Sequence, residues 1–434
     1  MNRSLKDSII IGLALFATFF GAGNLIFPPF LGLQSGTEWF KGIVGFIASG
    51  VVMPVVAIYI ISHAGGTVDS LTKKIHPKFS QLILLGLMIF STLIAIPRTA
   101  AVTHELGIQA LFPEFSIVPV IIVFFILTYY FVNDKNNVIN KIGGLLTPAL
   151  VVILVFIIVK GVLNPIAAPV ETGISNSFTN ALLGGYQTGD LLVSYMVASI
   201  FITDIVNKGY KTEKERNGMI AAAGVVAFIC LTVIYSGLLY LGATGSSIFP
   251  QDIDRAELLL STVRPILGSS GLYGLGIVVS LACLTTSIGL TTSVAQFFNE
   301  ASKGKIKYSV AAGVVCIIGT FIALMGVDKI VIISTPIYLS IYPICIVVIL
   351  VGLFYKYIPN TESYRGAVLM TGIISLSEAL MSIADVPFLE SLISSIPLSD
   401  MGFAWLIPSI IGFVGGAIIG SMNKQAIGKS ENAI

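Results

Sequence analysis

Residues 16–29 read Phe-Ala-Thr-Phe-Phe-Gly-Ala-Gly-Asn-Leu-Ile-Phe-Pro-Pro, a glycine-rich stretch inside an otherwise apolar run. Glycine in a helix interior costs about 1 kcal/mol relative to alanine and lets the backbone leave helical angles. Inside a bilayer, unwound backbone is tolerated only where its free N–H and C=O groups face protein or a water-filled cavity. The stretch therefore predicts a membrane helix that is interrupted at a site.

The composition of the whole chain agrees with a membrane protein. Of its 434 residues, 55% are hydrophobic and only 11% are charged, against roughly 25% charged in a soluble domain. The apolar runs are long enough to cross a hydrocarbon core of about 30 Å as helices. We therefore predict one all-α integral membrane domain over residues 1–434, embedded in the lipid bilayer, with about twelve transmembrane helices. They are expected at 8–32, 41–63, 79–104, 117–132, 143–162, 174–206, 218–241, 271–299, 308–326, 330–353, 366–384 and 402–421, with short extramembrane helices possible in 164–175 and 242–270.

Lysine and arginine are unevenly divided between the two sets of connections. Eighteen of the 24 fall on the side that holds the N-terminus and five on the other, while Arg98 lies within the predicted third helix. Such a bias marks the cytoplasmic side, so we predict a multi-pass protein of the cell membrane with both termini cytoplasmic. Nothing in the sequence indicates nucleic-acid binding or an obligate protein partner.

A second interruption occurs at residues 184–190, which read Gly-Gly-Tyr-Gln-Thr-Gly-Asp within the predicted helix 174–206. The two interrupted helices are the first members of two successive sets of five, over 8–162 and 174–353, with two additional helices over 366–421. Broken helices at matching positions of two halves indicate a transporter site near the bilayer midplane. The alternative is that small residues only permit close helix packing.

The residue types at the two interruptions suit a zwitterion such as an amino acid. Free N–H groups at the start of a helix half attract a carboxylate, and free C=O groups can accept from an ammonium group or coordinate a cation. Amide, hydroxyl and phenol groups add neutral donors and acceptors. The predicted substrate-binding residues are Gly21, Ala22, Gly23, Asn24, Tyr186, Gln187 and Thr188.

A third group of oxygens lies in the predicted eighth helix. Ala282, Thr285 and Thr286 share one helix face, so a carbonyl and two hydroxyls can converge on a small hard cation together with carbonyls of the first helix. The alternative is that both hydroxyls bond to their own helix backbone or to a neighbouring helix.

Four stretches together carry a family resemblance: residues 16–29, Ile-Pro-Arg-Thr-Ala at 96–100, Gly-Tyr-Gln-Thr at 185–188 and Leu-Thr-Thr at 284–286. Over essentially its whole length the chain resembles the branched-chain amino acid:cation symporters, which share the LeuT-type inverted-repeat fold. The resemblance implies import of leucine, isoleucine and valine, coupled to sodium by alternating access. It places sodium between the carbonyls of Ala17 and Phe20 and the oxygens of Ala282, Thr285 and Thr286. It also leaves open whether Asn24 binds substrate or a second cation.

Three charged residues fall within the predicted spans. Asp190 follows Gly189, where the family more often has an apolar residue, and we expect it to cap the second half of its helix, with a ligand role as the alternative. Arg98 either gates the outer entrance or pairs with a carboxylate, or it extends to the membrane interface. Glu378 lies outside the ten-helix core, and we expect a structural, hydrogen-bonded group, with a proton carrier as the alternative.

Other function classes are less well supported by the sequence. The spans contain no nucleophile–base pair or metal-ligand constellation that an enzyme would need, and no repeated selectivity motif typical of a channel. A phosphate-binding loop for ATP is also missing. The rival on the same fold is a proton-coupled transporter of another small amino acid or solute.

Overall fold

The computed structural model describes residues 3–73, 75–76, 78–133, 138–354 and 358–431, and these residues form helices and connections without any strand. Lys74, Lys135 and Lys356, three of the lysines counted above, lie outside the described residues. In chain order the helices are α1 (Arg3–Phe19), α2 (Ala22–Ser35), η1 (Gly36–Glu38), α3 (Trp39–Ile47), η2 (Ala48–Val52), α4 (Met53–His63), α5 (Val68–Thr72), α6 (Phe79–Phe90), η3 (Ser91–Ala95), α7 (Ile96–Val102), η4 (Thr103–Ile108), α8 (Ile117–Val132), α9 (Val138–Leu163), α10 (Ser177–Tyr186), α11 (Asp190–Asn207), α12 (Glu213–Thr244), α13 (Arg255–Ala301), α14 (Tyr308–Ala323), α15 (Val327–Leu353), α16 (Thr361–Met381), α17 (Pro387–Ser394), η5 (Ser399–Met401) and α18 (Leu406–Glu431).

Each predicted apolar range is largely helical, although the helix begins only at Ser177 in 174–206 and at Leu406 in 402–421. The two predicted interruptions are present. The range 8–32 is divided into α1 and α2, and 174–206 into α10 and α11. Residues 164–176 contain no helix, whereas the connection 242–270 does, because α13 begins at Arg255 and departs from helical angles at Gly268 (φ 65°, ψ −177°).

Two predicted helices contain π-helical segments that the apolar pattern did not predict. Segments η2 and η3 each end directly before a helix whose second residue is proline, Pro54 in α4 and Pro97 in α7. Proline has no N–H to donate and its ring clashes with the carbonyl four residues earlier, so the preceding turn widens into a π-bulge.

Length and composition make the protein a multi-pass membrane protein. Six described stretches are long and apolar enough to cross a membrane, and four shorter apolar helices accompany them. The six are Ala22–His63, Phe79–Ile108, Asp190–Asn207, Glu213–Thr244, Gly271–Ala301 and Val327–Leu353, and the four are Ile117–Val132, Pro148–Leu163, Tyr308–Ala323 and Leu406–Met422.

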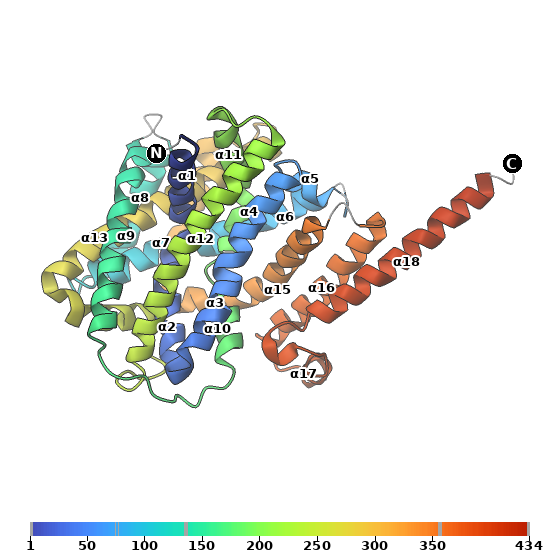
Figure 1. Cartoon of the computed structure of the whole chain (residues 1–434). Coiled ribbons are helices and arrows are strands. Elements are labelled where there is room, and N and C mark those ends of the chain that lie inside the picture. The colour runs from blue at the N-terminus through green and yellow to red at the C-terminus, as the bar shows by residue number, and fades with distance from the viewer. Residues whose placement is uncertain (1–2, 74, 77, 134–137, 355–357, 432–434) are drawn as a thin grey trace.

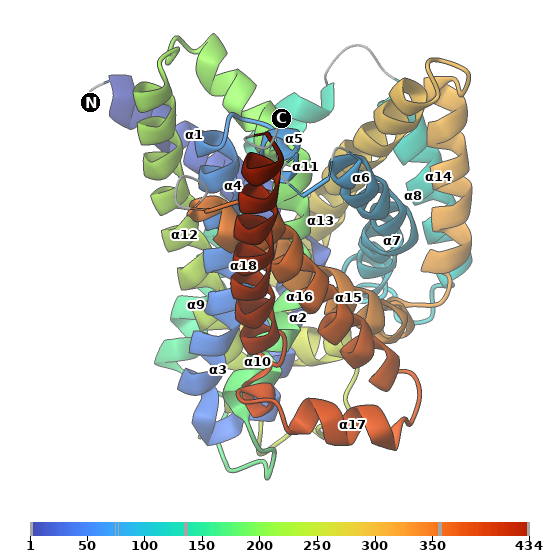
Figure 2. The same cartoon turned by 90° about the vertical axis from the view of Figure 1, so that its right-hand side faces the viewer.

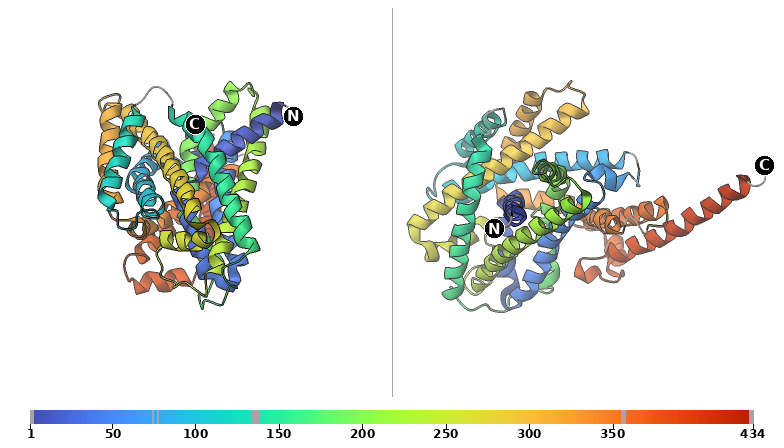
Figure 3. Two further views of the ribbon diagram at one scale, coloured as in Figure 1. Left: turned by 90° about the vertical axis from the view of Figure 1, so that its left-hand side faces the viewer. Right: turned by 45° about the horizontal axis from the view of Figure 1, so that its top comes forward.

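The helices form one bundle with an appendage at its side. Helix α12 packs against α1, α2 and α4, and α10 packs against α3. Helices α16 and α18 pack on each other and, through α16, on α15. Figure 1 shows α18 extending away from the bundle, and in Figure 2 it lies in front of the other helices. With the top of the molecule turned forward, α18 again extends away from the other helices (Figure 3, right).

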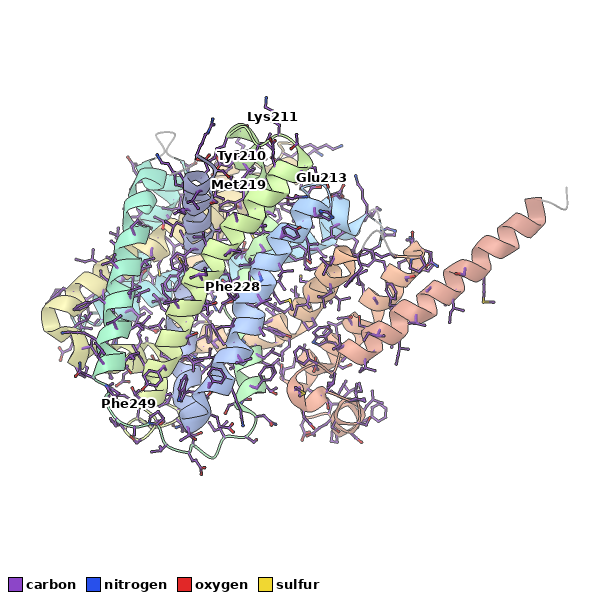
Figure 4. The ribbon with its side chains drawn as sticks, in the orientation of Figure 1. Tyr210, Lys211, Glu213, Met219, Phe228 and Phe249 are labelled. Atoms are coloured by element: carbon purple, nitrogen blue, oxygen red, sulfur yellow. The ribbon has the colours of Figure 1, made fainter. Side chains whose placement is uncertain are left out.

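The connections separate into two ends of the molecule. Tyr210, Lys211 and Glu213 lie at the end where α1 begins, and Phe249 lies at the opposite end (Figure 4). This division agrees with the predicted alternation of connections, although it leaves the direction across the membrane as a prediction.

Candidate functional site

The first interruption is a short extended step between α1 and α2. Helix α1 ends at Phe19 and α2 begins at Ala22, with Gly21 extended at φ −108° and ψ −169°. The Gly21 amide donates to Asn24 Oδ1 (3.1 Å). It therefore does not make the helical hydrogen bond to the carbonyl of Ala17, four residues earlier. Ala22, Gly23 and Asn24 are therefore not unwound but form the first turn of α2. The Asn24 amide donates to the Gly21 carbonyl (3.2 Å), whereas the amides of Ala22 and Gly23 have no intrahelical acceptor.

The second interruption depends on a left-handed glycine. Helix α10 ends at Tyr186 and α11 begins at Asp190, and Gly189 between them has φ 78° and ψ 4°. A Cβ atom there would be strained in this conformation and would lie 3.0 Å from the Tyr338 hydroxyl. Only glycine adopts this left-handed conformation without an energetic cost. The break between the two helices is shorter than the stretch 184–190 that the sequence indicated.

Side chains from three helices join the two interruptions. Asn24 Nδ2 in α2 donates to Asp190 Oδ2 in α11 (2.7 Å) and also contacts the Tyr235 hydroxyl of α12. Tyr235 in turn donates to Asp190 Oδ2 (3.4 Å). Asn24, Asp190 and Tyr235 are each 1% exposed. The expectation that Asp190 caps α11 is wrong: Gly189 occupies the cap position, and the carboxylate bonds across to α2.

Arg98 lies between the interruptions rather than at the membrane interface. Its side chain is 4% exposed, so the interpretation that it extends to the interface is wrong. Nη1 donates to the Gln187 carbonyl (2.7 Å) and Nη2 to the Thr188 carbonyl (3.3 Å). The guanidinium thereby satisfies two carbonyls that the break in α10–α11 leaves without helical partners.

Gly23 permits this approach of Arg98 to α2. A Cβ atom on Gly23 would lie 2.9 Å from Arg98 Nη2 and 3.0 Å from Cζ. The Arg98 guanidinium also lies over the ring of Phe27, 5.6 Å from its centroid. The break between α1 and α2 is thus lined by the buried guanidinium group of Arg98, which the sequence pattern did not predict at this position.

The polar side chains of the second interruption are held by protein groups. Gln187 Nε2 donates to Thr335 Oγ1 (2.9 Å), and Gln187 Oε1 accepts from Ser334 Oγ (3.1 Å). The Thr188 hydroxyl donates to the Gly185 carbonyl (2.9 Å). The ring of Tyr186 stacks on Tyr342, with centroids 4.1 Å apart. Gln187 and Tyr186 thereby hold the break against α15, whereas Thr188 bonds back to α10. Direct contact of these three residues with a substrate stays a prediction.

The predicted cation ligands of the eighth helix lie together on α13. The hydroxyls of Thr285 and Thr286 both donate to the Ala282 carbonyl, at 2.9 and 3.0 Å. Both hydroxyls thus bond to the backbone of their own helix, which from the sequence was the alternative to a cation site. Among the described residues, no hydrogen bond links these oxygens to Ala17 or Phe20, which lie at the end of α1 and in the break.

Nothing in the sequence indicated Tyr235, or that Arg98 bonds to the backbone of the second interruption. Tyr235 lies within an apolar run without any neighbouring signal, so only the packing of α12 against α2 reveals it. Glu378, in α16, makes no side-chain hydrogen bond with the described part of the chain, so the hydrogen bonding that we expected of its carboxyl group is not found there.

Solved transporters share this fold. The chain is similar to the "inward facing conformation of Mhp1" with a TM-score of 0.64 and 12% identity, covering 96% of this chain and 91% of the other. A sodium-coupled sialic acid symporter in a substrate-bound outward-open state gives a TM-score of 0.56 and 15% identity, over 96% and 90%. MhsT in complex with L-phenylalanine gives 0.55 and 15%, over 94% and 98%. These likenesses confirm the predicted LeuT-type all-α fold.

Sequence relatives identify the family. The model of a family described as "Branched-chain amino acid transport protein" matches residues 4–423. The branched-chain amino acid permease BraB of Bacillus subtilis (strain 168) is 33% identical over 99% of both chains. The permease BrnQ of the same organism is 32% identical over 96% of this chain and 98% of its own. These relatives are permeases, which confirms a transporter rather than an enzyme, and the chain belongs to the branched-chain amino acid transport protein family.

Proposed function

We propose that this protein imports leucine, isoleucine and valine across the cell membrane, coupled to sodium by alternating access, with both termini in the cytoplasm. The observation that carries the proposal is the bond between Asn24 and Asp190, which brings two broken helices together inside a chain of this family. Relatives named as branched-chain amino acid permeases support the substrate class.

The substrate carboxylate is assigned to the start of α2. The Gly21 amide is already bonded to Asn24, which leaves the amides of Ala22 and Gly23 at the positive end of the helix. The Arg98 guanidinium beside Gly23 adds a full positive charge in a buried setting. Together these groups would compensate a carboxylate that has left water.

The ammonium group and the side chain need different surroundings. We assign to the carbonyls of Ala17 and Phe20, at the end of α1 and in the break, the role of accepting from the ammonium group or coordinating sodium. Aromatic rings next to the break provide an apolar wall: Tyr235 packs on Phe20 (centroids 5.9 Å apart) and on Phe46 (5.3 Å). One methylene in such a pocket is worth about 1–3 kcal/mol, so discrimination among the three substrates should be modest.

Sodium is assigned to the space between α1 and α13. The hydroxyls of Thr285 and Thr286 would rotate from the Ala282 carbonyl toward the ion, so that three oxygens of α13 join the two carbonyls of Ala17 and Phe20. An ion held in this way ties the two helices together. It can favour one orientation of the bundle only through contacts that differ between the two states.

Uptake by the purified protein in proteoliposomes tests the substrate class. Radiolabelled leucine should enter when sodium is supplied outside, and unlabelled isoleucine and valine should compete, whereas alanine, lysine and glutamate should not. Protein-free liposomes provide the control. Uptake that a charged or small amino acid inhibits as strongly as valine does would contradict the assignment.

A further inference from the structure

A groove of about 450 Å³ lies where the appendage joins the bundle. Helix α15 forms its wall on the bundle side and α18 the opposite wall, while Ile358 and Ala367 of α16 and the connection before it complete the lining. Helix α16 packs on both α15 and α18, and Figure 1 shows it between them. Nine of the ten described residues that line the groove are apolar and none is charged, so the groove suits an apolar occupant.

Each long wall of the groove is one apolar face of a helix. On α15 the wall consists of Val347, Leu350, Val351 and Phe354, and on α18 residues 406, 409, 410 and 413 have the same spacing. Residues at i, i+3, i+4 and i+7 lie on one side of a helix, and such a face is about 11 Å long. Two matching helix faces therefore stand opposite each other with the groove between them.

The position of α18 is set by its contact with α16. A Cβ atom on Gly366 of α16 would lie 2.0 Å from the Gly412 carbonyl oxygen of α18, and one on Gly412 would lie 2.2 Å from the Gly366 carbonyl oxygen. The two backbones thus touch at these glycines. In a bilayer no hydrophobic force draws α18 onward toward α15, because lipid chains are as apolar as the side chains. The groove between α15 and α18 therefore follows from how the helices are held.

The surroundings of the groove decide what can fill it. Its walls belong to the apolar stretches Val327–Leu353 and Leu406–Met422, which places it at the depth of the lipid hydrocarbon. An ordered water needs two to four polar partners, and Ser409 carries the one polar side chain among the described residues of the lining. A groove left unfilled would deprive both helix faces of dispersion contacts. A hydrocarbon chain supplies those contacts without needing a polar partner.

We propose that this groove binds one acyl chain of a membrane phospholipid, held between α15 and α18. The chain enters beside Phe354 and Ile410, the most exposed side chains of the lining (57% and 51%), and lies along the two apolar faces. It links the appendage to the bundle where the two helices do not pack on each other. Neither interruption contributes to this lining, so the lipid site is separate from the proposed substrate site.

Native mass spectrometry of the purified full chain, washed extensively in a mild detergent, tests the lipid site. The wild-type chain should retain one phospholipid after the surrounding bilayer lipids are removed. Val351→Trp and Ser409→Trp, which place an indole in the groove from opposite walls, should each lose most of the bound phospholipid. Ile317→Trp is the matched control: Ile317 lies on α14 and is 60% exposed, so its substitution alters only a surface that faces exchanging lipids and should leave retention unchanged.

Thermal unfolding of the same proteins gives a second readout. Phospholipid added back to the stripped wild-type chain should raise its melting temperature by several degrees, because a ligand that binds only the folded state stabilises it by mass action. The Ile317→Trp protein should respond equally. The two groove variants should respond less, because their indoles occupy the place of the acyl chain.

A photoreactive acyl chain locates the lipid in the unmodified protein, so the test holds even if a groove variant fails to fold. A phospholipid with a diazirine in its acyl chain should label peptides that contain residues 347–354 or 406–413. Labelling confined to other peptides would overturn the proposal, as would equal phospholipid retention in the wild type and both groove variants. Retention of detergent alone, or a lipid-free dimer that the groove variants dissociate, would also overturn it, the dimer by showing that a second copy fills the groove.

Discussion

The side-chain amide of Asn24 bonds to both interruptions and so fixes the geometry of the site. Its oxygen accepts from Gly21 at one interruption, and its nitrogen donates to Asp190 at the other. Because Asn24, Asp190 and Tyr235 are all buried, losing one partner would leave the others unsatisfied at a cost of about 1–3 kcal/mol. The two interruptions are therefore fixed to each other and not merely adjacent.

Gly23 gives the first prediction. Gly23→Ala places a methyl group 2.9 Å from Arg98 Nη2 and 3.3 Å from the Phe27 ring, which displaces the guanidinium and crowds the amides assigned to the substrate carboxylate. Leucine affinity should fall about tenfold, because one strained contact costs on the order of 1–3 kcal/mol, and Gly23→Val should lower it further. Gly289→Ala has nothing within 4 Å of the new carbon and should bind leucine as the wild type does. Unchanged leucine affinity in a folded Gly23→Val protein would remove this turn from the site.

Thr285 and Thr286 give the second prediction. Alanine at either position deletes one oxygen, so the sodium concentration for half-maximal leucine uptake should rise severalfold, while leucine binding at saturating sodium changes less. Serine keeps the hydroxyl and should be milder. Thr320→Ala is the control, because Thr320 makes the same kind of backbone bond, to Cys316 in α14 (2.8 Å), away from the proposed ion. If the sodium concentration for half-maximal uptake rose equally in all three alanine variants, the substitutions would act only through helix packing.

At the scale of elements, α2 and α12 approach so closely at two glycines that there is no room for a side chain between their backbones. A methyl group on Gly242 would overlap the carbonyl of Pro29, and one on Gly32 would overlap the carbonyl of Leu239. This contact aligns Tyr235 of α12 with Asn24 of α2. The α12 residue that completes the site, Tyr235, is thus positioned by glycines about two helical turns away from it.

The third prediction concerns this contact. Gly242→Ala should force the helices apart, lowering the free energy of unfolding by about 1–3 kcal/mol, with a lower melting temperature in detergent and weaker leucine binding. Gly218→Ala in the same helix has no atom within 4 Å of the new carbon and gains up to about 1 kcal/mol of helix propensity. Its melting temperature should be unchanged or higher. A Gly242→Ala protein as stable as Gly218→Ala would show that the close contact does not constrain the helices.

The sequence predicted the interruptions because glycine clusters inside apolar runs have a direct backbone consequence. It did not predict η2 and η3, because the apolar pattern of a π-bulge is nearly that of the helix around it. Arg98 was misplaced for another reason: its partners are backbone carbonyls of residues 187 and 188, which have no signature of their own in sequence. Contacts made by backbone atoms across elements emerge only from the fold.

At the scale of the whole molecule, the two ends of the bundle differ in charge, and this difference predicts the topology. Single cysteines at Lys211 and Asp252, both exposed, in a chain lacking its four native cysteines, should react with a membrane-impermeant thiol reagent from opposite faces. Lys211 should react only from the cytoplasmic side. Labelling of both positions from one face would contradict the division of connections between the two ends, and reaction of Lys211 from outside would reverse the proposed orientation.

The central claim is that a sodium gradient drives branched-chain amino acids through the joined interruptions. The direct measurement is leucine accumulation in proteoliposomes under an imposed inward sodium gradient, an inward proton gradient, or neither, with choline replacing sodium. We predict a transient accumulation above the outside concentration with the sodium gradient alone, and its loss in Thr285→Ala and Thr286→Ala at low sodium. Accumulation that is unchanged in choline, or that follows only the proton gradient, would contradict the sodium assignment, and mere equilibration under every condition would contradict coupled transport.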